Sequence, residues 1–174
     1  MVRKYLALIH HPIINKRGEK VTTSVTNLDI HDIARSCRTF GFENYFLVTP
    51  IEKQVKLIGR ILDFWNEDVS NDYNPDRADA LSFIQVKSSF DQCLKSIEGH
   101  PIVIGTGANF KDYDGELPKA QELAKKEKRP LLIIFGTGWG LHPEILERVD
   151  YFVEPIHGTA TDGYNHLSVR SAVA

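Results

Sequence analysis

Two loops near the end of the chain have residue types and spacing suited to binding a ligand. The first, Gly136 to Leu141, contains three glycines within five positions, and backbone amides and carbonyls can approach a ligand closely where no Cβ intervenes. The second loop follows Ile156 and begins with His157 and Gly158. Because each loop follows a short apolar run, we expect both at the carboxyl ends of neighbouring buried strands, where α/β proteins bind ligands.

The elements that must position these loops alternate between strand and helix along the chain. We expect a first helix that is capped by Asn27 or Asp29 and stopped by Gly41. Residues 13–23, which are basic, and 68–79 are expected to be loops. The alternation predicts an α/β fold, a three-layer parallel sheet with helices on both faces. The predicted strands are residues 5–10, 45–48, 81–86, 101–104, 130–135 and 151–156, and the other predicted helices are residues 51–66, 88–97 and 116–128.

Length and composition favour one domain over residues 1–174, with 42% hydrophobic and 25% charged residues. Cys37 and Cys93 lie far apart without a CxxC pair, so the sequence suggests neither a zinc site nor a disulfide framework. We therefore expect a reduced, cytoplasmic protein without a metal. No apolar run reaches about 18 residues and no signal-like segment precedes the first strand, so we expect no membrane or secretory address.

Charge is unevenly distributed along the chain. The net charge of −2 argues against a wholly basic nucleic-acid binder, but residues 1–60 hold ten Lys/Arg against five Asp/Glu. Residues 61–120 hold five against eleven. A basic N-terminal third could contact phosphate groups while the acidic middle faces water. An asymmetry without function on a solvated surface explains the same numbers.

Several of these segments resemble motifs of the SPOUT superfamily, the α/β-knot RNA methyltransferases. The glycine loop that closes in Gly-Leu and the turn Pro155–Gly158 are similar to two motifs of its ribose 2′-O-methyltransferases. Residues 166–172 look like the family's last helix. Asn27-Leu28, Arg35 and residues 40–42 resemble the motif that carries the family's functional arginine. The resemblance implies a C-terminal trefoil knot, an obligate homodimer and a substrate that is tRNA or rRNA.

The same resemblance implies S-adenosylmethionine as the methyl donor. Its methyl group is already activated by the sulfonium, so the protein mainly positions a nucleophile and helps to remove its proton. No metal is required. The residues that the resemblance places around the cofactor are Gly105, Thr106, Phe135, Gly136, Thr137, Gly138, Gly140, Leu141, Ile156, His157, Gly158, Leu167 and Ser168.

Two catalytic residues are expected, and they correspond to two methyl-accepting atoms. Arg35 stays charged and suits a clamp on an RNA phosphate or on an emerging alkoxide, as ribose methylation would need. A base nitrogen would instead call for a carboxylate base, for which Asp162 is the candidate. Beside Gly163, this aspartate also suits a simple turn. Trp139 and Tyr164 could stack a base or fill their own loops.

Three classes of function remain open from the sequence. The favoured class is an RNA methyltransferase that acts as a homodimer. A catalytically silent SPOUT-type module, which binds RNA or only dimerises, is the alternative. A nucleotide-binding protein of the flavodoxin kind is a more distant third.

Overall fold

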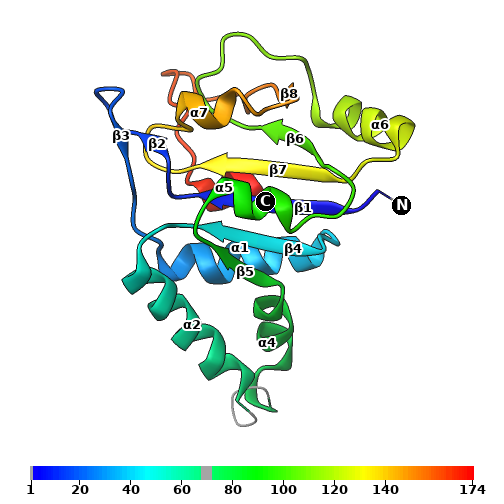
Figure 1. Ribbon diagram of the computed structural model, residues 1–174. Coiled ribbons are helices and arrows are strands. Elements are labelled where there is room, and N and C mark those ends of the chain that lie inside the picture. Colours follow the sequence, from blue (N-terminus) through cyan, green and yellow to red (C-terminus); the bar gives the residue numbers. More distant parts are fainter. Residues whose placement is uncertain (1, 68–71) are drawn as a thin grey trace.

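The core of the protein is a six-stranded sheet, and each neighbouring pair of its strands is parallel (Figure 1). The computed structural model describes residues 2–67 and 72–174. The strand order β5-β4-β1-β7-β6-β8 confirms the predicted parallel sheet. The strands are β1 (Lys4–Ile9), β4 (Asn44–Val48), β5 (Ile84–Lys87), β6 (Ile102–Gly105), β7 (Leu131–Gly136) and β8 (Tyr151–Phe152).

Helices cover both faces of this sheet, which gives the three predicted layers. Alternate residues of a strand point to opposite faces, so Leu6 and Leu8 pack with Ile33 on one face, while Ala7 packs with Phe90 on the other. The first face carries α1 (Asn27–Thr39), α2 (Glu52–Asn66), α4 (Pro75–Ser82), α6 (Leu117–Glu127) and α8 (Val169–Val173), and the second carries α5 (Phe90–Lys95) and α7 (Pro143–Leu146).

Helix α1 follows its predicted apolar stripe but begins with a different cap. Thr26, not Asn27 or Asp29, is the N-cap residue, and its hydroxyl accepts a hydrogen bond from the Asp29 amide at 3.2 Å. The Thr26 hydroxyl also donates to the Asp29 carboxylate at 2.6 Å. Gly41, at φ 68°, follows the helix end as expected. The two Thr26 bonds fix the entry of the chain into α1.

The basic segment that was predicted to be a loop forms a small antiparallel hairpin instead. Its strands are β2 (Ile13–Ile14) and β3 (Lys20–Val21). Ile13 is fully buried in the core cluster below the hairpin, and this burial explains why the segment is ordered at its base. The prediction of a surface loop was therefore wrong at Ile13.

Four further predictions need correction, and one of them is the strand at 81–86, which begins only at Ile84 because α4 continues to Ser82. Helix α4 begins inside the predicted loop 68–79, because the Asn74 side chain caps it and Pro75 occupies its first turn. Residues 68–71 of that prediction lie outside the described residues. Strand β8 ends at Phe152 rather than Ile156, and α8 begins at Val169 rather than His166. Helix α7 was not predicted at all.

The two cysteines lie on opposite faces of the sheet. Cys37 belongs to α1 and Cys93 to α5, and both thiols are buried and unpaired. Burial raises the pKa of each thiol to about 12. Among the described residues, no helix is long and apolar enough to cross a membrane.

The buried anchor of the hairpin can be tested by truncation. Replacing Ile13 with alanine should lower the free energy of unfolding by about 2–5 kcal/mol, because a fully buried isoleucine leaves a cavity. Ile14→Ala is the matched control, since the Ile14 side chain is only partly buried and its loss should cost clearly less. Urea denaturation of both variants gives the two values. Equal losses would show that Ile13 does not anchor the hairpin.

Candidate functional site

The glycine loop lies at the carboxyl edge of the sheet, where the hairpin holds its backbone. The Ile14 amide donates to the Gly140 carbonyl at 3.0 Å, and the Trp139 amide donates to the Ile14 carbonyl at 3.1 Å. The His142 amide donates to the carbonyl of Pro12 at 3.3 Å. The loop is thus fixed as a short continuation of the hairpin.

Two glycines of this loop have different surroundings. Gly138 has φ 60°, and a Cβ there would lie 3.0 Å from Ile13 Cδ1 and 3.3 Å from the Ile14 carbonyl oxygen. The space beside Gly138 is therefore filled by the hairpin. Gly140 has φ 118° and no atom within 4 Å of the place where a Cβ would be. The Cβ direction of Gly140 therefore points into open space, whereas that of Gly138 points at the hairpin.

A chain of partly buried hydrogen bonds holds the start of the same loop. Thr137 Oγ1 donates to the Ile9 carbonyl at 3.1 Å and lies 2.5 Å from Thr23 Oγ1, which lies 3.0 Å from His10 Nδ1. Since the Thr137 proton goes to Ile9, Thr23 must donate to Thr137 and accept from His10. The hydrogen bonds therefore place the imidazole proton on Nδ1.

Burial keeps this imidazole neutral. His10 is fully buried, and loss of hydration lowers its pKa from 6.5 to about 4. Its Nε2 has no hydrogen-bond partner among the described residues. His10 thus acts as a neutral donor that orients Thr23, and through it Thr137.

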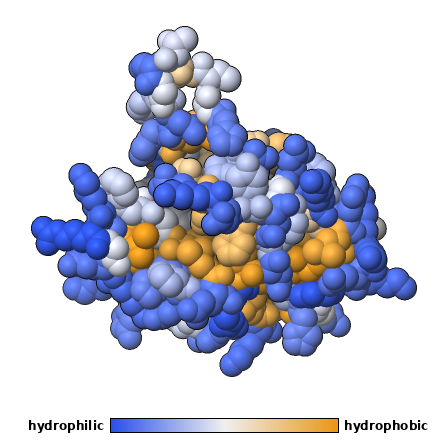
Figure 2. Space-filling view, turned by 90° about the horizontal axis from the view of Figure 1, so that it is seen from above, coloured by the Kyte–Doolittle hydropathy of each residue, from blue (hydrophilic) through white to orange (hydrophobic). Residues whose placement is uncertain are grey.

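The loop after β6 lies beside the glycine loop. Gly105 pairs with Ile134 of β7, and the Thr106 hydroxyl donates to the Ile134 carbonyl at 2.9 Å. Phe110 of the same loop packs edge-on against Phe152 of β8 at 5.3 Å between ring centroids. Figure 2, which looks down on the β8 side of the sheet, shows apolar residues gathered between hydrophilic margins. The structure therefore places Gly105 and Thr106 against Ile134 of β7, two residues before the glycine loop begins.

The remaining residues expected around the cofactor lie between β8 and α8. Residues 156–168 are exposed, and the Asn165 side chain donates to the Ile156 carbonyl at 2.9 Å. Ser168 caps α8 by accepting from the Ser171 amide at 3.2 Å. Two apolar residues of α8 pack against the cluster that Phe135 also contacts. This segment returns the chain from the far edge of the sheet to Phe135. The other expected residues on it are His157, Gly158 and Leu167.

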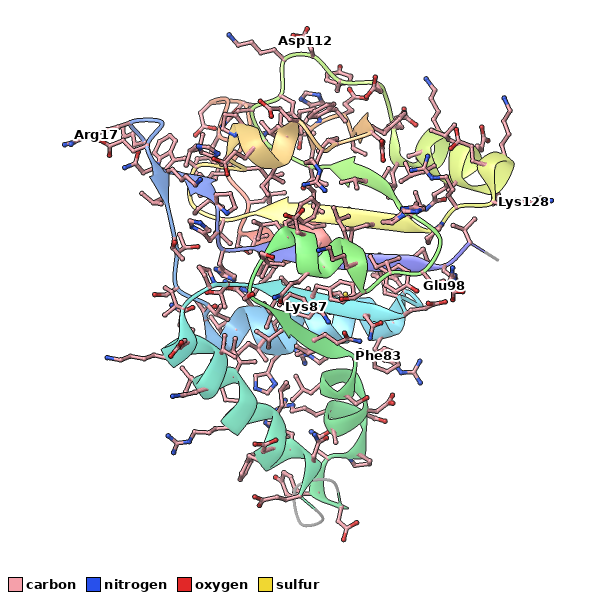
Figure 3. The ribbon with its side chains drawn as sticks, viewed as in Figure 1. Arg17, Phe83, Lys87, Glu98, Asp112 and Lys128 are labelled. Carbon is pink, nitrogen blue, oxygen red and sulfur yellow. The ribbon has the colours of Figure 1, made fainter. Side chains whose placement is uncertain are left out.

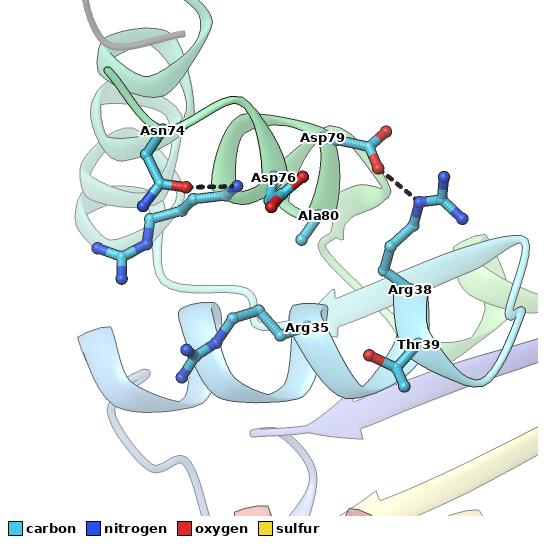
Figure 4. Close-up of a pocket in the computed structure, with 8 residues that line it drawn as sticks. Arg35, Arg38, Thr39, Asn74, Asp76, Asp79 and Ala80 are labelled. Carbon is cyan, nitrogen blue, oxygen red and sulfur yellow. Dashed lines mark hydrogen bonds and ion pairs between the residues drawn. The ribbon is translucent and has the colours of Figure 1, made fainter. Parts of the chain in front are cut away.

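The two expected catalytic residues do not line the same groove. Arg35 is exposed, pairs with Asp32, and lines a groove of about 490 Å³ between α1 and α4 (Figure 4). Arg38 lines the same groove and pairs with Asp79 at 2.6 Å. The lining contains no residue of the glycine loop or of residues 153–168.

Asp162 makes the turn contact that its glycine neighbour suggested. Its Oδ1 accepts a hydrogen bond from the Tyr164 amide at 3.0 Å, and Gly163 has φ 78°. The carboxylate is exposed. The turn accounts for an aspartate at this position without excluding a second role.

Sequence reasoning missed an ionic cluster that joins the last helix to α1. Arg170 Nη1 lies 2.8 Å from Asp29 Oδ1, and only 4% of Asp29 is exposed. Arg170 Nε also lies 3.8 Å from Asp32, the residue that pairs with Arg35. A carboxylate this buried needs an ionic or hydrogen-bonding partner. The one available signal was an aspartate beside the apolar stripe of α1.

Comparison with known proteins agrees with this architecture. A SpoU methyltransferase from Streptomyces viridochromogenes, solved in complex with AdoMet, is similar at a TM-score of 0.53 and 16% identity, covering 99% of this chain and 54% of that chain. The fold is therefore that of the SPOUT methyltransferases. A family profile described as SAM-dependent RNA methyltransferase matches residues 3–174, and the chain belongs to this family.

Two relatives differ in length from one another. A tRNA (guanine-N(1)-)-methyltransferase of Oleidesulfovibrio alaskensis is 41% identical over 98% of this chain, which spans only 40% of that protein. An uncharacterized protein of Aquifex aeolicus is 34% identical over 98% of this chain and 84% of its own length. Related sequences thus occur both within a longer protein and in one of similar length.

Burial of neutral His10 predicts a loss of stability in acid. The unfolded chain takes up a proton near pH 6.5, whereas folded His10 does so only near pH 4. The contribution of His10 is therefore complete above pH 6.5 and is lost as the pH falls toward 4, by about 3 kcal/mol. Urea unfolding between pH 7.5 and 4.5 should show this loss. His10→Asn, which keeps a donor for Thr23, should reduce it, and an unchanged slope would contradict neutral burial.

Proposed function

We propose that this chain transfers the methyl group of S-adenosylmethionine to tRNA. The match of residues 3–174 to a SAM-dependent RNA methyltransferase family carries the proposal. The tRNA substrate comes from the name of the relative from Oleidesulfovibrio alaskensis. Because that protein is much longer, its guanine-N1 activity is a hypothesis for this chain. The candidate methyl-accepting atoms are a ribose hydroxyl and a base nitrogen.

The cofactor would lie against the glycine loop on the side of Gly140. Positive φ and free space at this position leave the backbone accessible to a flat ring. The fixed hydrogen bonds of Thr137 and Thr106 hold the two neighbouring loops in place before any ligand arrives. The bound cofactor would supply an activated methyl group, and the chain would contribute position and proton removal.

A homodimer would supply what one chain lacks. Arg35 lines the α1–α4 groove, and the lining of this groove holds no residue of the glycine loop, so Arg35 of a second copy would complete a site that contains both. Leu28, Ile156 and Leu167 are large apolar side chains, and all three are about half exposed. Leu28 precedes Asp29 and Leu167 lies three residues before Arg170, so the Asp29–Arg170 pair holds together the two segments that carry these leucines. Both leucines would contribute apolar area to a dimer interface. The proposed dimer joins these surfaces.

The C-terminal trefoil knot belongs to the same proposal. Support comes from the course of residues 153–168, which return from the sheet edge so that α8 packs on α1 and beside Phe135. In a knotted chain this segment would close the cofactor crevice. The ionic bond between Arg170 and Asp29 would hold the closure.

The accepting atom can be identified with two variants. If the acceptor is a ribose hydroxyl, Arg35→Ala should slow single-turnover methylation about 10²-fold or more, the scale of losing a charge-stabilising group. If it is a base nitrogen, Asp162→Asn should cause the comparable loss, because asparagine keeps the acceptor for the Tyr164 amide but is no base. Arg38→Ala is the matched control in the same groove.

The assay uses tRNA from cells that lack the enzyme and labelled S-adenosylmethionine. Wild-type rates in both the Arg35 and the Asp162 variants would remove both catalytic assignments and favour the silent module. Absence of transfer by the wild-type protein would overturn the proposed function itself. Calorimetric titration with the cofactor distinguishes a silent protein that still binds it from one that does not.

The dimer has its own test in solution. Sedimentation at micromolar concentration should give about twice the 19.7 kDa mass of the chain. Leu28→Asp places a charge on the proposed apolar surface and should shift the protein toward monomer. Leu57→Asp changes a similarly exposed leucine on α2 and should leave the dimer intact. A wild-type monomer that methylates tRNA would contradict a shared site.

A further inference from the structure

The β2–β3 hairpin carries a basic tip that projects away from the sheet (Figures 1 and 3). Arg17 lies at its outer end in Figure 3. The Asn15 side chain accepts hydrogen bonds from the amides of Arg17 and Glu19 at 2.8 and 3.0 Å, and Gly18 has φ 77°. The tip therefore has a defined turn and presents its side chains from a fixed backbone.

The charges at this tip are only partly neutralised. Lys20 pairs with Glu144 at 2.6 Å, and Glu19 accepts from the Asn15 side chain at 2.7 Å. Lys16 and Arg17 have no carboxylate within 4 Å among the described residues. Two exposed cations thus remain available to an anionic partner.

An exposed tryptophan lies beside Lys16. Trp139 is 56% exposed, although it belongs to the glycine loop, and Lys16 Nζ lies 5.8 Å from the centroid of its ring. Its amide donates to Ile14 of the hairpin, so the ring and the basic tip share one backbone framework. The core does not need this side chain, because more than half of its surface faces solvent.

An exposed aromatic ring beside Lys16, on a hairpin whose tip also carries Arg17, matches single-stranded nucleic acid. Bases stack on exposed aromatic rings, while lysine and arginine contact the adjacent phosphates. A duplex would present its bases already stacked, so an unpaired nucleotide fits the ring better. The basic excess of residues 1–60 includes this tip.

We propose that Trp139 and the hairpin tip, Lys16 with Arg17, form an RNA-binding surface that stacks one unpaired base and contacts its phosphates. The proposal rests on the proposed function, since it assigns the substrate-binding surface of the same enzyme. Its position has a mechanical consequence, because the hairpin and the glycine loop share hydrogen bonds at Ile14. RNA held on the tip would therefore bind a hairpin that is hydrogen-bonded to the loop bordering the proposed cofactor site.

Binding of a short, fluorescent, unpaired RNA oligonucleotide tests this surface by anisotropy. Trp139→Ala should weaken binding about 5- to 150-fold, the range for losing one stacked base. Trp139→Phe should restore most of the affinity because it keeps an aromatic face. Phe64→Ala is the matched control, since Phe64 of α2 is 55% exposed and far from the hairpin in sequence. It should bind RNA like the wild type.

Salt dependence separates the phosphate contacts from the stacking. Replacing Lys16 and Arg17 together with alanine should reduce the slope of log affinity against log salt by about 1.4, that is, two contacts to a single strand. Trp139→Ala should leave the slope unchanged. Lys125 and Lys126, exposed at the end of α6, give a double-alanine control of equal charge.

The RNA-binding surface and the proposed methyltransferase activity can be refuted independently of each other. Wild-type affinity and slope in the Trp139 and hairpin-tip variants would overturn the surface, even if the protein methylates tRNA, and so would a wild-type protein that binds no unpaired RNA. Conversely, a wild-type protein that binds RNA through Trp139 but transfers no methyl group would support the surface and refute the enzyme.

Discussion

The parallel pairing of β1 with β7 is the constraint on which the rest of the structure depends. It joins residues 4–9 to residues 131–136 in one ladder at the middle of the sheet. Both strands are almost wholly apolar and are buried between the two helical layers. Because Ile9 lies opposite Gly136, the chain leaves both strands at the same place. His10 and Thr137 therefore follow neighbouring strand ends, where Thr23 joins them by hydrogen bonds.

Hydrogen bonds and an ion pair then fix the positions of the glycine loop and α8, which pairing of the strands alone does not determine. The hydrogen bonds from His10 through Thr23 to Thr137 set the start of the glycine loop, and the hairpin holds its end. On the other face, the Asp29–Arg170 pair fixes α8 against α1. Buried polar contacts of this kind cost hydration and contribute little net stability. Their value here is geometric, since each holds a segment that has few apolar contacts of its own.

The sheet could be predicted from sequence because its strands are apolar runs bounded by glycine, proline or polar residues. The hairpin could not, since strands of two residues show no periodicity, and its anchor Ile13 is a single apolar residue in a basic segment. Helix α4 was missed because Asn74 and Pro75 mark turns and helix starts equally well. The glycine loop was placed correctly at the sheet edge. The Asp29–Arg170 ion pair could not be predicted from the sequence, because its members lie 141 positions apart in the chain.

The two buried cysteines can be used as probes of local unfolding in this protein. Each thiol is buried in a different helical layer, and a pKa of about 12 leaves almost no thiolate at neutral pH. An alkylating reagent can therefore react only after the layer around that thiol has separated from the sheet. Mass spectrometry after pulses of reagent would tell whether the α1 and α5 sides open in one cooperative event or one after the other.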